Sequence, residues 1–512
     1  MFKGYFEIKL SEEQQEIIDT PGNIIVSASA GTGKTHTLVS KITKDLQENN
    51  THKVIAAITF TVKAAKEIKK RMRVDTTSSF IGTNNRFAIS EVIKPFARDV
   101  FNPKLKIKGV DYSIKHKTFN ECLDYLKSQG IVGVYADTKR DFIFELALYI
   151  VKSSLACQLY LKSKYFKLYI DEYQDCDKEM HNFFMYICKK LKIQLFIVGD
   201  EKQSIYVWRG AYPEAMNEIR KSNDFSKKKL RKNFRSCQQI QNYSNLLMSA
   251  TSNLYSPCRN KNSIILMSAL SDDWADKVKQ YLNLNAKCAL LRHSNKDAKN
   301  DALELNNMGM DFIYIPKLPI SEISTNVKWL YNAIAQYFIF SEYSIYDLID
   351  DIPEKYIDDK EIIGSLQNKL KILKESLLDN FELASSTMEN IASSLGYVTE
   401  LKHIELLRKT VSEKRQSTLA FRMNELPHVA TTVHSSKGLE YDQVIIFAND
   451  YDLDNENDVY NHYVAVTRAI SKLIIIILKD DVQQHRGKQF CSKLNKRFSN
   501  QNVDLQDIMT IV

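Results

Sequence analysis

One loop constrains the fold of this chain more than any other feature of its sequence. The loop Ala28–Thr35 follows an apolar, strand-like segment at 23–27 and precedes a helical stretch, His36–Asp45. A strand, a glycine-containing loop and a helix in this order bind phosphate, because the loop amides and the helix N-terminus point toward the same anion. The pattern therefore predicts a P-loop within an α/β fold.

The residues of this P-loop have separate predicted tasks. The amides around Gly31 and Gly33 face the phosphate oxygens. The Lys34 ammonium contacts the β- and γ-phosphates, and the Thr35 hydroxyl ligates Mg²⁺. Kinases, transporters and motors share such a loop, so it does not define the enzyme. We predict that nucleotide lies against Ala28, Ser29, Ala30, Gly31, Thr32, Gly33, Lys34 and Thr35.

A second strand-like run, at 168–170, ends in acidic residues. Acids at the carboxyl end of a parallel strand lie beside the P-loop in the same sheet. Asp171 is predicted to hold Mg²⁺, directly or through water. Glu172 is predicted to orient and deprotonate the attacking water. The alternative, a solvated acidic loop, is disfavoured by the P-loop that precedes it.

A third run, Val198–Ala211, combines a strand end with polar and aromatic residues. Gln203, just past the strand, is predicted to sense the γ-phosphate. Tyr206 and Trp208 are predicted to stack on nucleic acid bases, and such stacking contributes about 1–3 kcal/mol per base. Core aromatics are the alternative, which the polar neighbours Ser204 and Arg209 disfavour.

Composition narrows the class of protein. Lys and Arg outnumber Asp and Glu by 71 to 62 in 512 residues, which suits a polyanionic partner, and the length predicts two to four domains. None of the eight cysteines falls in a CxxC pair, so zinc and iron–sulfur spacings are absent and reduced thiols are expected. The longest aliphatic run, at 473–478, is too short to cross a bilayer. We expect a cytoplasmic protein without a membrane partner.

Apolar runs divide the chain into two α/β halves. Such runs between helical stretches indicate parallel sheets, and they fall before about residue 230 and after about residue 260. They are Asn23–Ala28, Val54–Phe60, Leu168–Ile170, Leu195–Val198, Ser263–Met267, Phe312–Ile315, Val429–Val433, Gln443–Phe447 and Leu473–Leu478. Two mainly helical stretches interrupt the halves, and one of them carries the helically spaced segment Glu361–Lys374. The predicted architecture is two RecA-like domains at 1–85 with 161–229 and at 230–317 with 426–512, with helical insertions at 86–160 and 318–425.

Together with further motifs, this order resembles the UvrD/Rep/PcrA branch of superfamily 1 DNA helicases. The blocks run from residue 10 to about 478, in the order that the family has. The additional motifs are Leu10–Gln14, Thr59–Ala65, Gly82–Phe87, Leu230–Ser236, Ala289–Asn295, Thr432–Tyr441 and Tyr463–Ala469.

The resemblance implies roles for individual residues. Gln14 reads the adenine, Phe234 stacks on it, and His36 stands where the family often has a base-stacking arginine. Gln203, Arg235 and Arg468 contact the γ-phosphate, following the arginine-finger logic. Glu440 contacts the sugar or phosphate region of the nucleotide. The implied cofactors are ATP and Mg²⁺, and the DNA-contact residues are Phe60, Thr61, Lys63, Asn85, Tyr206, Trp208 and His434.

The sequence departs from the family pattern mainly where DNA is gripped. Val62 replaces the usual asparagine, and Asn85 and Arg86 replace a His-Ser pair. Asn457–His462 replaces an acidic and arginine-rich run. The nucleotide residues are otherwise kept, so these departures concern DNA grip and strand separation more than ATP hydrolysis.

Two functional hypotheses follow from the residues and the resemblance. The first is an ATP-dependent DNA translocase or helicase, 3′→5′ by resemblance, acting in DNA repair or antiphage defence on single-stranded DNA or DNA with single-stranded ends. The second is an ATPase subunit that senses DNA or nucleotides and regulates a nuclease. Its compact size resembles the helicase subunit of Gabija-type antiphage systems, which implies an OLD-family nuclease partner in a hetero-oligomer. A P-loop protein that does not hydrolyse ATP is disfavoured by the carboxylates, Gln203 and both arginines.

Overall fold

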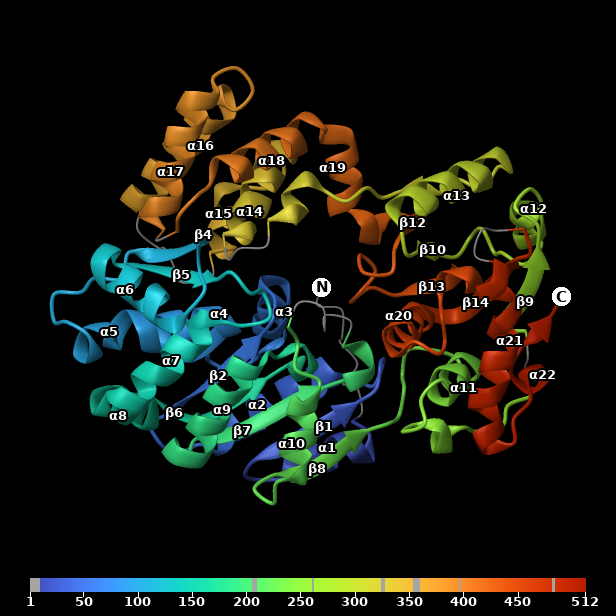
Figure 1. Cartoon of the computed structure of the whole chain (residues 1–512), viewed down its shortest axis with the longest axis horizontal. Coiled ribbons are helices and arrows are strands. Elements are labelled where there is room, and N and C mark those ends of the chain that lie inside the picture. The colour runs from blue at the N-terminus through green and yellow to red at the C-terminus, as the bar shows by residue number, and fades with distance from the viewer. Residues whose placement is uncertain are drawn as a thin grey trace, which may run out of the picture. The chain divides into compact units, whose positions relative to one another are not determined.

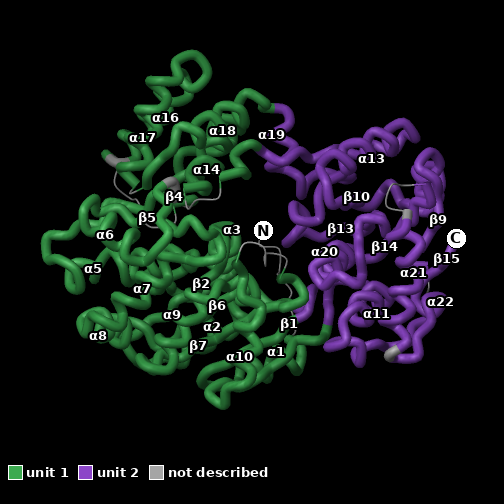
Figure 2. Tube along the Cα trace, viewed as in Figure 1, with its two compact units in different colours: residues 1–28, 33–232, 319–414 green, residues 29–32, 233–318, 415–512 purple. Residues whose placement is uncertain are grey.

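The computed structural model describes residues 10–204, 210–259, 262–323, 327–352, 360–395, 397–480 and 484–512. Contacts along the chain divide it into two compact units (Figure 2). Unit 1 comprises 1–28, 33–232 and 319–414, and unit 2 comprises 29–32, 233–318 and 415–512. Each unit is built on its own parallel sheet.

Unit 1 contains a six-stranded parallel sheet (Figure 1). The strand order is β3-β2-β6-β7-β1-β8, with bounds β1 Ile24–Ala28, β2 Val54–Thr59, β3 Phe80–Thr83, β6 Tyr165–Ile170, β7 Gln194–Gly199 and β8 Ser226–Leu230. Helix α1 Glu12–Asp19 precedes β1, and the helices that follow these strands include α2 Lys34–Glu48, α3 Val62–Arg71, α9 Lys178–Leu191 and α10 Glu214–Lys221. Parallel strands covered on both faces are continuously apolar, as β7 is from Leu195 to Val198.

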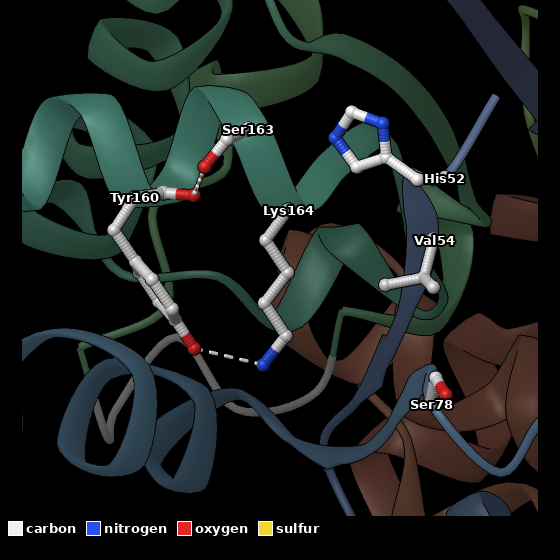
Figure 3. A pocket seen from close by; sticks show the side chains of 6 residues that line it. All are labelled: His52, Val54, Ser78, Tyr160, Ser163 and Lys164. Atoms are coloured by element: carbon white, nitrogen blue, oxygen red, sulfur yellow. Dashed lines mark hydrogen bonds between the residues drawn. The ribbon is translucent and has the colours of Figure 1, made fainter.

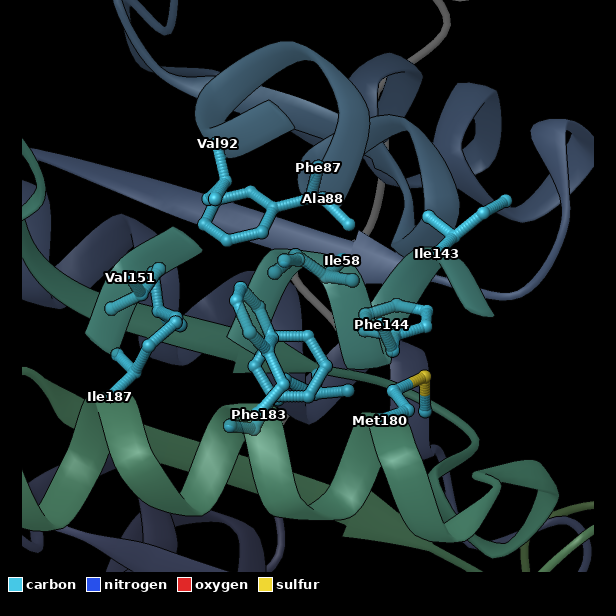
Figure 4. Packing of buried hydrophobic residues seen from close by; sticks show 14 of the residues in the cluster. Ile58, Phe87, Ala88, Val92, Ile143, Phe144, Val151, Met180, Phe183 and Ile187 are labelled. Carbon is cyan, nitrogen blue, oxygen red and sulfur yellow. The ribbon is translucent and has the colours of Figure 1, made fainter. Parts of the chain in front are cut away.

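The segment at 86–160 continues the core of unit 1. It contains α4 Asn84–Phe87, the π-helical turn η1 Ala88–Ile93, α5 Lys94–Val100, β4 Gly109–His116, α6 Phe119–Gln129, β5 Ile131–Tyr135, α7 Phe142–Ser153 and α8 Leu155–Lys164. The segment is mainly helical, as predicted, but β4 and β5 add a small parallel sheet. Phe87, Phe144 and Phe183 pack together in one buried cluster with the β2 residue Ile58 (Figure 4). The cluster joins this segment to the sheet.

In the described part of the chain, no single helix is long and apolar enough to cross a membrane. The pair α7 and α8 passes the length and composition test only when taken together, with a bend of 99° between them. Seven residues of α7 are buried in the core of unit 1.

Unit 2 contains a seven-stranded sheet whose order is β11-β12-β10-β13-β14-β9-β15, again parallel throughout. The bounds are β9 Ile264–Ala269, β10 Cys288–Arg292, β11 Ile313–Tyr314, β12 His428–Thr432, β13 Tyr441–Phe447, β14 Ala469–Leu478 and β15 Thr510–Ile511. Its helices are α11 Gln238–Leu246, α12 Trp274–Lys279, α13 Asn295–Asn307, α19 Lys414–Phe421, α20 Glu456–Val466, α21 Gln484–Phe498 and α22 Leu505–Ile508. All nine predicted apolar strands are confirmed, with small shifts at their ends.

The second helical segment lies between β11 and β12 in the sequence, as predicted. It consists of α14 Lys328–Ile339, α15 Ile345–Asp350, α16 Lys360–Ser376, α17 Phe381–Ser394 and α18 Leu401–Ser412. Its contacts group residues 319–414 with unit 1, and an ion pair joins Lys66 of α3 to Asp351 at the end of α15. The sequence pattern did not predict that residues 319–414 group with unit 1.

Candidate nucleotide and DNA site

The P-loop has the predicted strand–loop–helix form, with β1 ending at Ala28 and α2 beginning at Lys34. Gly31 and Gly33 adopt the left-handed backbone region, with φ of 72° and 79°. A Cβ at Gly31 would stand 2.6 Å from Asn233 Oδ1, and one at Gly33 would stand 2.8 Å from Gln14 Nε2. Both the backbone conformation and the neighbouring side chains therefore require glycine.

Gln14 lies against the P-loop because helix α1 fixes it there. The residue belongs to a capping box in which Ser11 N donates to Gln14 Oε1 at 3.0 Å. Gln14 is buried, and its amide nitrogen is the group nearest to the missing Cβ of Gly33. In the first turn of α2, burial lowers the pKa of the His36 imidazole and the charge of Arg71 lowers it further. His36 is therefore neutral near pH 7.

The two predicted carboxylates follow β6. Asp171 N donates to Ile58 O at 2.9 Å, and the Asp171 carboxylate accepts from Glu172 N at 2.9 Å. Burial raises the pKa of Asp171 to about 7, the charge of Glu172 adds to this, and Lys34 opposes it. Glu172 has a φ of 53°, which is unfavourable for a residue with a side chain, and its Oε2 lies 3.6 Å from Lys34 Nζ. The P-loop lysine and the predicted general base are thus neighbours.

The end of β7 supplies a further buried acid that the sequence analysis did not select. Asp200 Oδ2 accepts from Gln203 Nε2 at 2.7 Å, and Asp200 Oδ1 pairs with Lys202 Nζ at 2.7 Å. Burial alone would raise the pKa of Asp200, but Lys202 and then Lys34 outweigh it and the pKa is lowered. Asp200 therefore stays ionised and orients the predicted sensor Gln203. The sequence could have indicated Asp200, because it directly follows an apolar strand, as Asp171 does.

The sheet order sets the nucleotide residues beside the DNA candidates. Phe60, Thr61 and Lys63 follow β2, and Asn85 follows β3, its direct neighbour. β2 also pairs with β6, which carries the carboxylates. The Thr61 hydroxyl caps α3 by accepting from Ala64 N at 3.1 Å, so it is engaged in the helix start. Tyr206 and Trp208 lie outside the described residues.

Within unit 2, the predicted phosphate-contacting arginines bond to protein groups. Arg235 Nε donates to Glu440 Oε2 at 2.7 Å, and Arg235 Nη1 donates to Thr467 O at 3.3 Å. Arg468 is buried and donates to Val464 O at 2.9 Å and Leu439 O at 3.1 Å. A γ-phosphate would have to replace some of these partners.

The same unit holds Phe234, which is predicted to stack on the adenine, and His434, one of the predicted DNA-contact residues. Phe234 is 52% exposed, and its N–H donates to Gly31 O at 2.9 Å. His434 lies in the turn after β12. Phe234 is thus a partly exposed aromatic residue whose backbone is bonded to the P-loop.

Two residues that the sequence analysis did not select contact the P-loop directly. Asn233 Nδ2 donates to Ala30 O at 3.0 Å, while Asn233 Oδ1 accepts from Arg235 N at 2.7 Å and from Ser236 N at 3.0 Å. The Tyr463 hydroxyl accepts from Ala30 N at 3.4 Å. Asn233 reaches the loop because β8 runs parallel to β1, with Leu230 opposite Ala28. One carboxamide therefore links the loop to the backbone of Arg235.

A pocket of about 350 Å³ lies elsewhere in unit 1 (Figure 3). Its lining residues are His52, Val54, Ser78, Tyr160, Ser163 and Lys164. Val54 begins β2 and Lys164 directly precedes β6, so the pocket lies at the amino ends of these strands. The P-loop and the carboxylates lie at the other end of the sheet, after the carboxyl ends of its strands.

The chemistry of the predicted Mg²⁺ ligands fits the ion. Thr35 offers a hydroxyl in the first turn of α2, and Asp171 offers a buried carboxylate. Magnesium prefers oxygen ligands and in nucleotide sites is held by one or two protein groups together with phosphates and water. The described residues contain no cluster of three or more His, Cys, Asp or Glu suited to a metal.

Comparisons with known proteins agree with this arrangement. Residues 14–209 match the model of an AAA domain, and residues 427–476 match the model of a UvrD-like helicase C-terminal domain. The fold and these two matches define the chain as a protein with UvrD-like helicase domains. It is 42% identical over 482 residues to the Gabija protein GajB of Bacillus cereus (strain VD045), across 91% of this chain and 94% of that protein. The chain therefore belongs to the GajB family.

Larger helicases are more distant relatives. A probable DNA helicase II homolog of Rickettsia conorii is 27% identical over 57% of this chain and 52% of its own length. The ATP-dependent DNA helicase PcrA of Staphylococcus epidermidis is 28% identical over 46% of this chain and 39% of its own length. This chain thus spans about half or less of these helicases, and the predicted UvrD-like resemblance is confirmed.

Proposed function

We propose that this protein is an ATP-dependent DNA translocase or helicase that works at the carboxyl edge of the unit 1 sheet. The observation that carries the proposal is the order of strands at this edge. The P-loop after β1, Gln203 after β7 and the carboxylates after β6 adjoin the DNA candidates after β2 and β3. Because the nucleotide and DNA residues follow neighbouring strands, a change at the ATP site would act on the DNA contacts over a short distance.

The chemical roles follow from the geometry of each group. Lys34 binds the β- and γ-phosphates, while Thr35 and Asp171 hold Mg²⁺, which supplies charge neutralisation of the phosphates when bound. Glu172 takes a proton from the attacking water. Gln203, oriented by Asp200, contacts the γ-phosphate.

The proposal requires the two arginines of unit 2 to change their hydrogen-bond partners. Arg235 and Arg468 contact the γ-phosphate only after leaving protein partners, Glu440 in the first case and main-chain carbonyls in the second. An arginine that moves from a carboxylate to a phosphate exchanges one charge-assisted hydrogen bond for another, so the exchange has a small net cost. ATP binding would thereby be coupled to a rearrangement of these side chains within unit 2.

DNA is proposed to follow the carboxyl ends of β2 and β3. Phe60 and Asn85 contact it there, with Lys63 on its phosphates, and His434 is a further proposed contact. Tyr206 and Trp208 are also proposed DNA contacts, and they lie outside the described residues. The 3′→5′ direction rests on resemblance to the helicase family. Because family DNA-contact residues are altered in this chain, translocation on single strands is better supported than efficient unwinding.

A second function is favoured by one observation, the 42% identity to the Gabija protein GajB. In this alternative, the ATPase senses DNA or nucleotides in antiphage defence and controls an OLD-family nuclease within a hetero-oligomer. Co-purification of the chain with an OLD-family nuclease expressed together with it tests the partnership. Loss of nuclease control in a Lys34→Ala variant tests whether the ATP site governs it.

Displacement of streptavidin from biotinylated single-stranded DNA distinguishes the motor from the sensor. A 3′→5′ translocase removes streptavidin from the 5′ end when ATP is present, and faster than from the 3′ end. The Lys34→Ala variant serves as the matched control. Equal, ATP-independent release at both ends would contradict translocation and leave the sensor.

A further inference from the structure

Gln174 is buried beside the candidate general base and uses both ends of its carboxamide. It is 3% exposed. Gln174 Nε2 donates to Glu172 Oε2 at 2.6 Å, and Gln174 Oε1 accepts from Asp200 N at 2.9 Å. One side chain therefore bridges the acid after β6 and the backbone at the end of β7.

The surroundings hold Gln174 in this bridge. Its carbonyl oxygen accepts from Ser204 Oγ at 3.1 Å. A Cβ at Gly199 would stand 2.7 Å from Gln174 Oε1 and 3.2 Å from Gln174 N, so a larger residue at 199 would push the carboxamide away. A buried amide with both ends bonded has one favoured orientation.

Two donors approach the same oxygen of Glu172. Gln174 Nε2 lies 2.6 Å from Glu172 Oε2, and Lys34 Nζ lies 3.6 Å from it. If the nearer donor were absent, the carboxylate would be free to close on the lysine, because an ion pair in a half-buried site gains more than a solvated one. Lys34 would then be drawn from the phosphates and Glu172 from the water.

We propose that Gln174 is a positioning residue for ATP hydrolysis: it keeps the Glu172 carboxylate from closing further on Lys34 than their 3.6 Å ion pair and ties it to the strand end that precedes Gln203. The inference rests on the proposed ATPase function and deepens it. Gln174 acts through Glu172 and does not touch nucleotide. Misplacing a general base by about 1 Å can cost about 10²-fold in rate, so the effect falls on kcat. ATP binding depends on the P-loop and Gln14 and stays near its normal strength.

Two substitutions separate the ends of the carboxamide. Gln174→Met has similar length and removes both hydrogen bonds, while Gln174→Glu keeps an acceptor for Asp200 N and loses the donor to Glu172. The exposed Gln47 on α2 provides a matched control, Gln47→Met. The measurements are kcat and KM for ATP with saturating single-stranded DNA, and the thermal midpoint of each protein.

We expect both Gln174 variants to lower kcat by about 30- to 100-fold with KM for ATP within about 3-fold, and Gln47→Met to match the unaltered chain. Gln174→Glu lowers the thermal midpoint, because it buries a carboxyl group beside the Glu172 carboxylate, so kcat is compared below that midpoint. If one Gln174 variant does not fold, the other decides alone. A kcat within about 3-fold of the unaltered chain, or equal changes in kcat and KM, would overturn the inference. Absence of turnover in the unaltered chain would instead refute the proposed ATPase function.

Discussion

Replacing Asn233 by alanine tests how the P-loop is linked to the arginine of the second unit. The change removes three hydrogen bonds, one to Ala30 O and two from the backbone of Arg235 and Ser236. Each is worth about 0.5–1.5 kcal/mol net. Because Asn233 is partly exposed, we take the lower half of that range and expect a local loss of about 1.5–3 kcal/mol.

Hydrogen exchange measures this local loss directly. The backbone amides of residues 235 and 236 lose their hydrogen-bond acceptor in this variant. A local loss of about 1.5–3 kcal/mol, at about 1.4 kcal/mol per tenfold change in rate, makes these amides exchange about 10- to 150-fold faster. The exposed Asn285→Ala is the matched control and should leave the exchange of this segment unchanged. Exchange at 235 and 236 that is no faster in Asn233→Ala would refute the reasoning, since it would mean that Asn233 does not hold this backbone.

Three further outcomes follow from buried groups and from the P-loop. Burial lowers the pKa of His462 to about 3 from its ordinary value near 6.5, so only the unfolded chain gains this proton as pH falls below about 6.5. The free energy of unfolding, measured with urea, should therefore fall between pH 7 and pH 5.5 by about 1 kcal/mol less in His462→Gln than in the unaltered chain. An equal fall in the two proteins would contradict this. Asp45→Ala leaves Lys41 and Lys167 buried without their shared carboxylate and should cost about 3–5 kcal/mol in the same assay, with a cost below about 1 kcal/mol arguing against the network. Gly33→Ala places a Cβ 2.8 Å from Gln14 and should weaken ATP binding at least about tenfold in titration of a fluorescent ATP analogue, whereas unchanged affinity would show that the loop tolerates the side chain.

Buried, continuous apolar runs made most strands predictable, but the fully buried β10 and several strands of other kinds were not among the predicted runs. β8 was overlooked because it is an edge strand, in which Lys227 and Lys229 are exposed. Its pattern lacks both the apolar run of a central strand and a clean alternation. β5 was not predicted although three of its five residues are buried, because so short an apolar run between helices is not distinguished from a buried helix segment by its pattern. Its partner β4 was also not predicted.

The candidate site was predictable wherever one residue type at one spacing carries the chemistry. The P-loop and the strand-end acid Asp171 are of this kind. The sequence analysis did not select Gln174, Asp200 and Asn233, because their contacts depend on which strands are neighbours. No local sequence pattern specifies the order of strands in a sheet. The grouping of 319–414 with unit 1 is also a long-range property, of which the Lys66 ion pair is one example.

Steady-state ATP hydrolysis by the purified chain, with and without single-stranded DNA, tests the central claim most directly. The matched variants are Lys34→Ala, which removes the phosphate contact, and Glu172→Gln, which removes the general base. The account predicts strong stimulation by DNA, and loss of turnover in both variants with ATP still bound by Glu172→Gln. ATP binding without turnover in the unaltered chain, on DNA as well as off it, would contradict an autonomous motor.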